Sequence, residues 1–185
     1  DEVLREGAGG EAEYGQVADR LVDLVNTNTE LFHDSSDNCY ATFTNKGHSE
    51  CWNLESSGFR NWLSYMYFLE THGAPSETAL KAAFGTLLGQ AKYEGAEKPV
   101  FRRVAKDGEA LWIDLCDEEW KAIKVLPGSW EVVEDPPVMF VRSPTMTPLP
   151  IPSEKGDIDP LWSLINIPDE DRILLLCWML ECFRV

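Results

Sequence analysis

The sequence predicts an α+β fold in which a pair of helices packs with antiparallel β-hairpins, followed by a proline-rich connector and a C-terminal helix. Two stretches near the middle of the chain repeat apolar residues at helical spacing. Several short apolar runs flank dipeptides that favour tight turns. Prolines cluster between residues 135 and 160, where they preclude a helix. At 185 residues and 44% apolar composition, the chain can bury a sizeable core.

The N-terminal part is expected to contain a tail, a helix and a hairpin. Residues 1–12 are rich in Gly, Ala and Glu, which predicts a disordered tail before an α+β module over residues 13–134. Apolar residues at helical spacing predict a helix from Tyr14 to Thr27. Two strand-like runs, Cys39 to Thr44 and Ser49 to Leu54, flank the turn residues 45–47 and predict a hairpin.

Two helices separated by a short turn come next. The clearest helix has its apolar stripe at Phe59, Trp62, Leu63, Met66 and Tyr67, after Ser56 and Ser57 as possible caps. Gly73 and Pro75 end this helix. Ser76 is placed to cap a second helix, whose stripe is Leu80, Ala83, Phe84, Leu87, Leu88 and Ala91. With the hairpin that follows, the pair is also similar in outline to a winged helix.

A β-meander is predicted after the helices. The runs Val100 to Ala105 and Ala110 to Leu115 join through Asp107-Gly108, a favoured hairpin dipeptide. This register puts Val104 opposite Leu111 and buries Val100, Val104, Leu111, Ile113 and Leu115 on one face. On the other face it sets Arg103 opposite Trp112, which would allow a cation-π stack. Lys121 to Leu126 and Trp130 to Val133 form two further strands, turned by Pro127-Gly128.

The C-terminal part is a connector over residues 135–160 and a helical segment over residues 161–185. Pro168, followed by three acids, marks a strong helix start. The helix from Arg172 to Phe183 is apolar nearly all round, so it needs cover on every side. We therefore expect the native protein to continue past Val185, or a partner to cover this helix.

The distribution of charge predicts that any anionic partner binds the middle of the chain. The net charge is −16, which disfavours a surface that coats nucleic acid uniformly. Residues 81–124, however, balance eight acids with eight bases, and Gly85 and Gly89 share a helix face with two lysines. The candidate nucleic-acid contacts are Lys81, Lys92, Lys98, Arg102, Arg103 and Lys106.

Compartment and chemistry are constrained by what the sequence lacks. No apolar run has the length of about 18 to 20 residues that a bilayer crossing needs, and no secretory signal is visible. Five cysteines without a CxxC pair indicate reduced thiols and a cytoplasmic protein. The motifs GxxxxGK[ST], GxGxxG, GxSxG and HExxH are absent from the sequence. We therefore predict no catalytic residue and no bound cofactor within residues 1–185.

Two chemical sites are weaker alternatives. His33, Cys39, His48 and Cys51 are potential zinc ligands, but their spacing is irregular and core thiols are favoured instead. Asp107 or Asp114 with Glu119 and Lys121 imitates the acid and lysine pattern of a metal-dependent nuclease. Such short strings occur by chance in acidic proteins.

A family resemblance covers most of the chain from about Leu31. The run Tyr40-Ala-Thr-Phe, the pattern His48-x-Glu-x-Trp-x-Leu54 and the run Trp130-Glu-Val-Val-Glu-Asp-Pro-Pro137 resemble the region before the ATPase module in a family of phage and mobile-element proteins. The P-loop domains of these proteins are similar to those of primase-associated helicases. The resemblance implies that a strand and a Walker A loop follow the last helix, with ATP and magnesium bound only in that missing domain.

The sequence therefore predicts a non-catalytic N-terminal module of a larger DNA-dependent P-loop ATPase or helicase. Its expected partners are DNA, its own ATPase domain or a protein that covers the C-terminal helix, and further copies in an oligomer. One alternative is an acidic protein-interaction module that does not bind nucleic acid. The second alternative is the metal-dependent nuclease.

Overall fold

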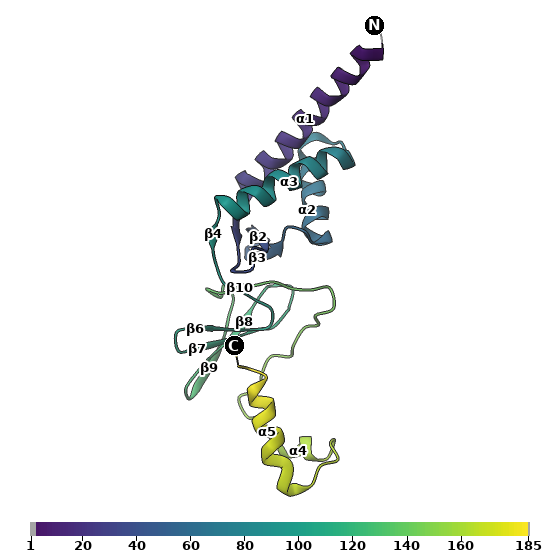
Figure 1. The fold of residues 1–185 in the computed structure, drawn as a ribbon. Helices are drawn as coiled ribbons and strands as arrows, with labels where there is room; N and C mark the ends of the chain where they lie inside the picture. The colour runs from purple at the N-terminus through teal and green to yellow at the C-terminus, as the bar shows by residue number, and fades with distance from the viewer. Residues whose placement is uncertain (1–2, 185) are drawn as a thin grey trace. The chain divides into compact units, whose positions relative to one another are not determined.

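The computed structural model describes the backbone of residues 3–184 and the side chains of residues 15–184. It confirms the α+β fold (Figure 1). The chain divides into two compact units, one made of residues up to 100 with 139–142 and the other of residues 101–138 with 143 onward. This boundary falls inside the single module that the sequence predicts for residues 13–134. Within the described residues, no helix is both long enough and apolar enough to cross a membrane.

The first unit is a four-stranded sheet with three helices on one of its faces. The strand order is β3-β2-β1-β4, antiparallel except for β4, which runs parallel to β1. Two-stranded pairing also joins β5 to β10. The elements are α1 (Val3–Asn28), β1 (Glu30–His33), β2 (Cys39–Asn45), β3 (His48–Asn53), α2 (Ser57–Thr71), α3 (Glu77–Tyr93), β4 (Ala96–Glu97) and β10 (Met139–Phe140), and the boundary with the second unit falls inside β5 (Val100–Phe101).

Alternation along β2 divides the core of this unit between the two faces of the sheet. Ala41 and Phe43 point to the helices, where they pack with Leu21, Phe59 and Leu87. On the opposite face, Phe32, Tyr40 and Cys51 form a smaller cluster with Val100, Met139 and Val141. The predicted helix pair is thus confirmed as α2 and α3, and its apolar stripes are the faces that the sheet buries.

Local signals set most boundaries in the first unit. The Ser56 and Ser76 hydroxyls accept hydrogen bonds from the backbone N–H of Phe59 and Ala79, so each serine is an N-cap. The predicted hairpin is confirmed, with Lys46 and Gly47 both at positive φ in a two-residue loop. Helix α1, by contrast, extends over residues 3–12, where composition predicts a tail. Alanine and glutamate favour helix. Apolar periodicity, which predicts a start at Tyr14, detects only the turns of the helix that pack against the core.

The second unit is a four-stranded antiparallel meander followed by irregular and helical segments. The strand order is β6-β7-β8-β9. The predicted turn at Pro127-Gly128 is confirmed, with Gly128 at a φ of 81°. The elements are β6 (Val104–Asp107), β7 (Ala110–Asp114), β8 (Ala122–Leu126), β9 (Ser129–Val133), α4 (Asp159–Trp162), the 3₁₀ turn η1 (Asp169–Asp171) and α5 (Arg172–Glu181).

The predicted register of the first hairpin in this unit is wrong by two residues. Asp107 pairs with Ala110, and Val104 lies opposite Ile113 rather than Leu111. The loop is Gly108-Glu109 instead of Asp107-Gly108, because Gly108 takes positive φ at the first loop position, as type II′ turns require. Trp112 therefore faces Ala105, and the predicted stack on Arg103 is replaced by Lys124, whose ammonium lies 5.8 Å from the Trp112 ring centroid.

The predicted buried face of the meander is confirmed at Leu115, which is buried, but not at its other residues. A shift of two residues keeps Val104, Leu111 and Ile113 on one face, and all three are only partly buried. The other face carries Ala105 and the buried Trp112. Part of the proline-rich segment runs close to the sheet, because Arg103 donates to the Thr147 carbonyl and the Leu149 N–H donates to the Leu115 carbonyl.

Candidate interaction surfaces

The six predicted nucleic-acid contacts are divided between the two units. Lys81, Lys92 and Lys98 belong to the first unit, whereas Arg102, Arg103 and Lys106 belong to the second. Lys81, Arg102 and Lys106 are exposed. Lys92, Lys98 and Arg103 are engaged by groups of their own unit.

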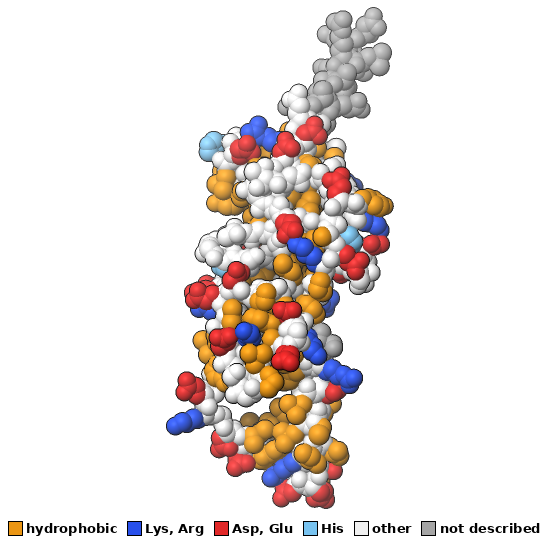
Figure 2. Space-filling model, turned by 90° about the vertical axis from the view of Figure 1, so that its left-hand side faces the viewer, with side chains coloured by type: hydrophobic (Ala, Val, Ile, Leu, Met, Phe, Trp, Pro, Cys, Tyr) orange, Lys and Arg blue, Asp and Glu red, His pale blue; other side chains and the backbone are white. Residues whose placement is uncertain are grey.

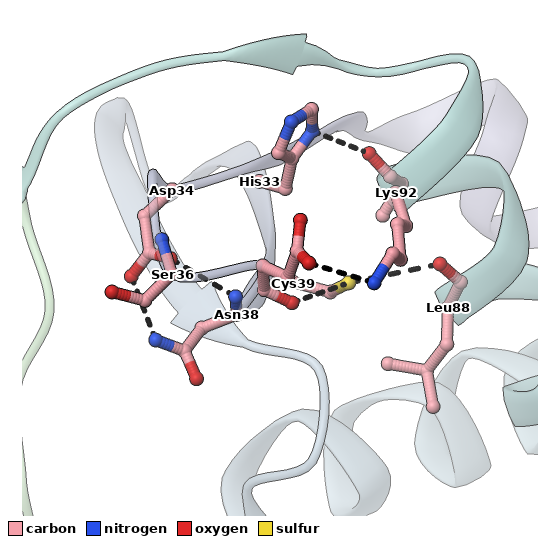
Figure 3. Close-up of polar contacts among 9 residues, drawn as sticks. His33, Asp34, Ser36, Asn38, Cys39, Leu88 and Lys92 are labelled. Atoms are coloured by element: carbon pink, nitrogen blue, oxygen red, sulfur yellow. Dashed lines mark hydrogen bonds and ion pairs between the residues drawn. The ribbon is translucent and has the colours of Figure 1, made fainter.

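Lys92 anchors the loop between β1 and β2 to the end of α3. Its ammonium lies 2.8 Å from the Asp37 carboxylate (Figure 3). This hydrogen bond and the charge of Asp37 raise the pKa of Lys92. Two further contacts join the same elements, since His33 Nδ1 lies 3.1 Å from the Ala91 carbonyl and the Cys39 thiol donates to the Leu88 carbonyl. Lys92 therefore has a structural contact within the fold.

Asp34 shapes this loop by accepting four hydrogen bonds. Its donors are the backbone N–H groups of Ser36 and Asn38, the Asn38 side-chain amide and the Tyr40 hydroxyl, at 2.8 to 3.0 Å. Burial raises the pKa of Asp34, but the hydrogen bonds outweigh burial and the pKa lies below its usual value. Asp37, at a φ of 63°, then completes the turn and faces Lys92.

Lys98 and Arg103 are engaged in a similar way. Lys98 lies 2.6 Å from the Glu30 carboxylate and 5.5 Å from the Phe32 ring centroid. Arg103 donates from its two terminal nitrogens to the carbonyls of Asp114 and Thr147, both at 3.1 Å. A phosphate contact at either residue would compete with these interactions.

The glycine face of α3 is open. A Cβ atom added at Gly85 or Gly89 meets nothing within 4 Å. A shallow pocket of about 290 Å³ lies beside Gly89, lined also by Leu88, Lys92 and Tyr93. Glycine inside a helix costs stability relative to alanine and can allow another group to pack closely. The described residues of this chain make no such contact at Gly85 or Gly89.

Glu50 on β3 is a buried acid that is not among the residues predicted from the sequence. The Glu50 carboxylate accepts hydrogen bonds from the Asn45 amide at 2.7 Å and the Trp52 indole at 2.6 Å, and lies 3.0 Å from His48 Nε2. His48, Glu50 and Trp52 alternate along one strand, so all three share a face. That alternation was the signal available in the sequence.

The residues of the two weaker chemical alternatives take the following positions. His33 pairs with Cys39 across β1 and β2, while His48 contacts Glu50. Burial raises the pKa of the Cys51 thiol to about 12. Asp114 is buried and accepts from the Cys116 N–H, and Glu119 forms an ion pair with Lys121. Over residues 15–184, no three His, Cys, Asp or Glu side chains gather in a way that could hold a metal ion.

Helix α5 carries a group of exposed apolar side chains in the second unit. None of its residues is buried, and Ile173, Leu174, Trp178 and Leu180 expose 62 to 71% of their surface. Figure 2 shows hydrophobic side chains at the surface over this end of the chain. Exposed apolar patches are typical of interaction surfaces and ligand-binding grooves. A smaller apolar group, Tyr65, Phe68 and Leu69, is exposed on α2.

Comparisons with protein-family models, with curated proteins and with solved structures found no match to this chain.

Proposed function

We propose that this chain is the non-catalytic N-terminal module of a larger cytoplasmic DNA-dependent P-loop ATPase, and that its role is assembly. The exposed apolar surface of α5 carries the proposal. Burying four large apolar side chains of this helix would contribute about 1.5 to 3 kcal/mol for each one that becomes fully buried. In the assembled protein, α5 packs against the ATPase domain, and ATP and magnesium bind in that domain.

The contacts of the cations favour assembly over nucleic-acid binding. Lys92 and Lys98 hold acids of the first unit, and Arg103 holds two carbonyls of the second. Releasing them toward phosphates would break interactions of the fold. The net charge of −16 adds a long-range repulsion of nucleic acid. In this proposal, other parts of the ATPase bind DNA.

The gene itself tests the context of the proposal. We expect the reading frame beyond Val185 to encode a strand and a glycine-rich loop ending in Gly-Lys-Ser or Gly-Lys-Thr within a few dozen residues. A stop codon directly after Val185 would overturn the link to an ATPase. The acidic protein-interaction module, in which α5 binds a separate protein, would then be the better description.

Thiol chemistry tests the role of α5 directly. Cys177 and Cys182 are exposed on and next to this helix, whereas Cys39 and Cys51 are buried. Modification of Cys177 by a maleimide, followed by mass spectrometry, should be at least about tenfold slower in the full-length protein than in residues 1–185 alone, because packing excludes the reagent. Equal rates would contradict packing of α5. The partly exposed Cys116 is the internal control, and its rate should not change.

A further inference from the structure

The outer edge of the second sheet is formed by β9, and its backbone groups are open. Among the described strands, β9 pairs with β8 alone. The Leu115 N–H donates to the Lys121 carbonyl, which fixes Ile123 and Val125 as the β8 residues that bond to β7. The alternate residues of β8 therefore bond to β9. By the same alternation, the backbone N–H and C=O groups of Trp130 and Val132 point away from the sheet.

This edge lacks two of the usual devices that prevent strand addition, a proline and a bulge. Natural edge strands are protected by proline, a bulge or charged side chains. The pairing of β9 with β8 is continuous over five residue pairs, and the strand contains no proline. Its one charged residue, Glu131, is 3.3 Å from Lys124 of the neighbouring strand. The opposite edge differs, since Lys106 and Asp107 occupy half of β6.

The side chains beside this edge specify the pattern of an added strand. Trp130 and Val132 lie on the partly buried apolar face, in rows with Val125 and Ile123 of β8. Trp130 is 39% exposed, so a strand with apolar residues on this face would extend both rows. Glu131 points to the other face. A residue of the added strand near Glu131 would therefore be favoured if it is basic.

We propose that β9 is a docking edge for an extended segment of a partner protein in which apolar and basic residues alternate. The segment adds a fifth strand, with its backbone bonded to Trp130 and Val132 and its basic side chains beside Glu131. Glu134 and Asp135, exposed just after β9, extend the acidic rim. This binding is independent of α5 and of the proposed ATPase.

The probe is a fluorescent nine-residue peptide of alternating valine and lysine, titrated into the chain and followed by anisotropy. The control peptide alternates valine and glutamate. We expect the lysine peptide to bind at least about tenfold more tightly, and this ratio to fall in Glu131→Lys, because a base then replaces the acid beside the added strand. Equal binding of the two peptides, or no binding of either, would overturn the proposal.

Proline substitution separates edge pairing from charge. Val132→Pro removes an N–H that faces outward, which edge strands tolerate, and should weaken lysine-peptide binding about tenfold or more. Val132→Thr keeps the N–H and should leave binding within about twofold. Lys106→Pro places the same lesion at an outward position of β6 and should leave binding unchanged. Equal losses in both proline variants, or a dimer of the free chain that Val132→Pro dissociates, would refute a partner strand at β9.

Discussion

Glu50 is a buried carboxylate that takes its three polar neighbours from its own hairpin. Asn45, His48 and Trp52 all direct a nitrogen toward it. Glu50→Ala leaves these groups without their acceptor in a buried site, and we expect the free energy of unfolding to fall by about 2 to 4 kcal/mol. Urea denaturation measures the change. Glu55→Ala, at an exposed acid nearby, should stay within about 0.5 kcal/mol, and equal losses in the two variants would contradict the role of Glu50.

Tyr40 couples stability to alkaline pH. Burial, with the hydrogen bond to Asp34, raises the pKa of Tyr40 from 10.0 to about 12. Between these values the unfolded chain loses a proton that the folded chain retains, so this residue makes stability fall as pH rises from 10 to 12. Tyr40→Phe should flatten that fall, as urea titrations across the range would show. An unchanged slope would indicate that Tyr40 ionises in the folded state as it does in the unfolded one.

Gly58 shows how closely one residue position is constrained. A Cβ atom there would lie 1.7 Å from the Trp52 ring, so the ring and the start of α2 are in direct contact. Gly58→Ala should destabilise the first unit by about 1 to 3 kcal/mol, because the indole must move and its bond to Glu50 is strained. Gly85→Ala is the matched control, since nothing lies within 4 Å of an added Cβ atom. It should be neutral or stabilising in thermal unfolding, as alanine favours helix.

At the scale of the element, two adjacent serines at the start of α2 have different roles. The sequence allows Ser56 or Ser57 as the cap, and the structure selects Ser56, whose hydroxyl accepts from the Phe59 N–H at 3.1 Å. Ser56→Ala should cost about 1 kcal/mol. Ser57→Ala lies inside the first turn and should cost a few tenths at most, because alanine favours helix. Thermal unfolding of both variants checks the assignment, which fails if their midpoints shift equally.

Elements with local signals could be predicted from the sequence, and elements with distant partners could not. The hairpin at residues 39–53 and the caps of α2 and α3 depend on neighbours in the chain. Strand β1 has only two apolar residues, too few for a recognisable alternation. It also pairs with β4, which is distant in the sequence. The register of β6 and β7 was ambiguous because Gly108 suits either of two loop positions.

The candidate site was less predictable than the fold for the same reason. Lys92, Lys98 and Arg103 are candidate nucleic-acid contacts when only their neighbours in the sequence are considered. Their partners lie 55, 68 and 44 residues away in the sequence, at Asp37, Glu30 and Thr147. Charge counting along the chain cannot detect such pairs. The exposed apolar surface of α5 was predictable from the sequence. A helix that is apolar on all sides exposes apolar side chains wherever it meets solvent.

At the scale of the whole molecule, the net charge disfavours DNA binding by this chain. The chain carries a net charge of −16, and three of the six candidate cations already have contacts within the fold. We therefore expect no measurable binding of a labelled DNA duplex at physiological salt, and at most weak binding at low salt, by fluorescence anisotropy. The result should not depend on the duplex sequence.

Two matched triple variants make this expectation decisive. One replaces Lys81, Lys92 and Arg103 with alanine, and the other replaces the exposed bases Lys46, Lys155 and Arg184, so both lower the net charge by the same amount. If the candidate set formed a DNA site, the first variant would lose affinity and salt dependence well beyond the second, since each phosphate contact contributes about 0.9 to the salt slope. Equal and weak binding of both variants would instead show that Lys81, Lys92 and Arg103 do not form a DNA site.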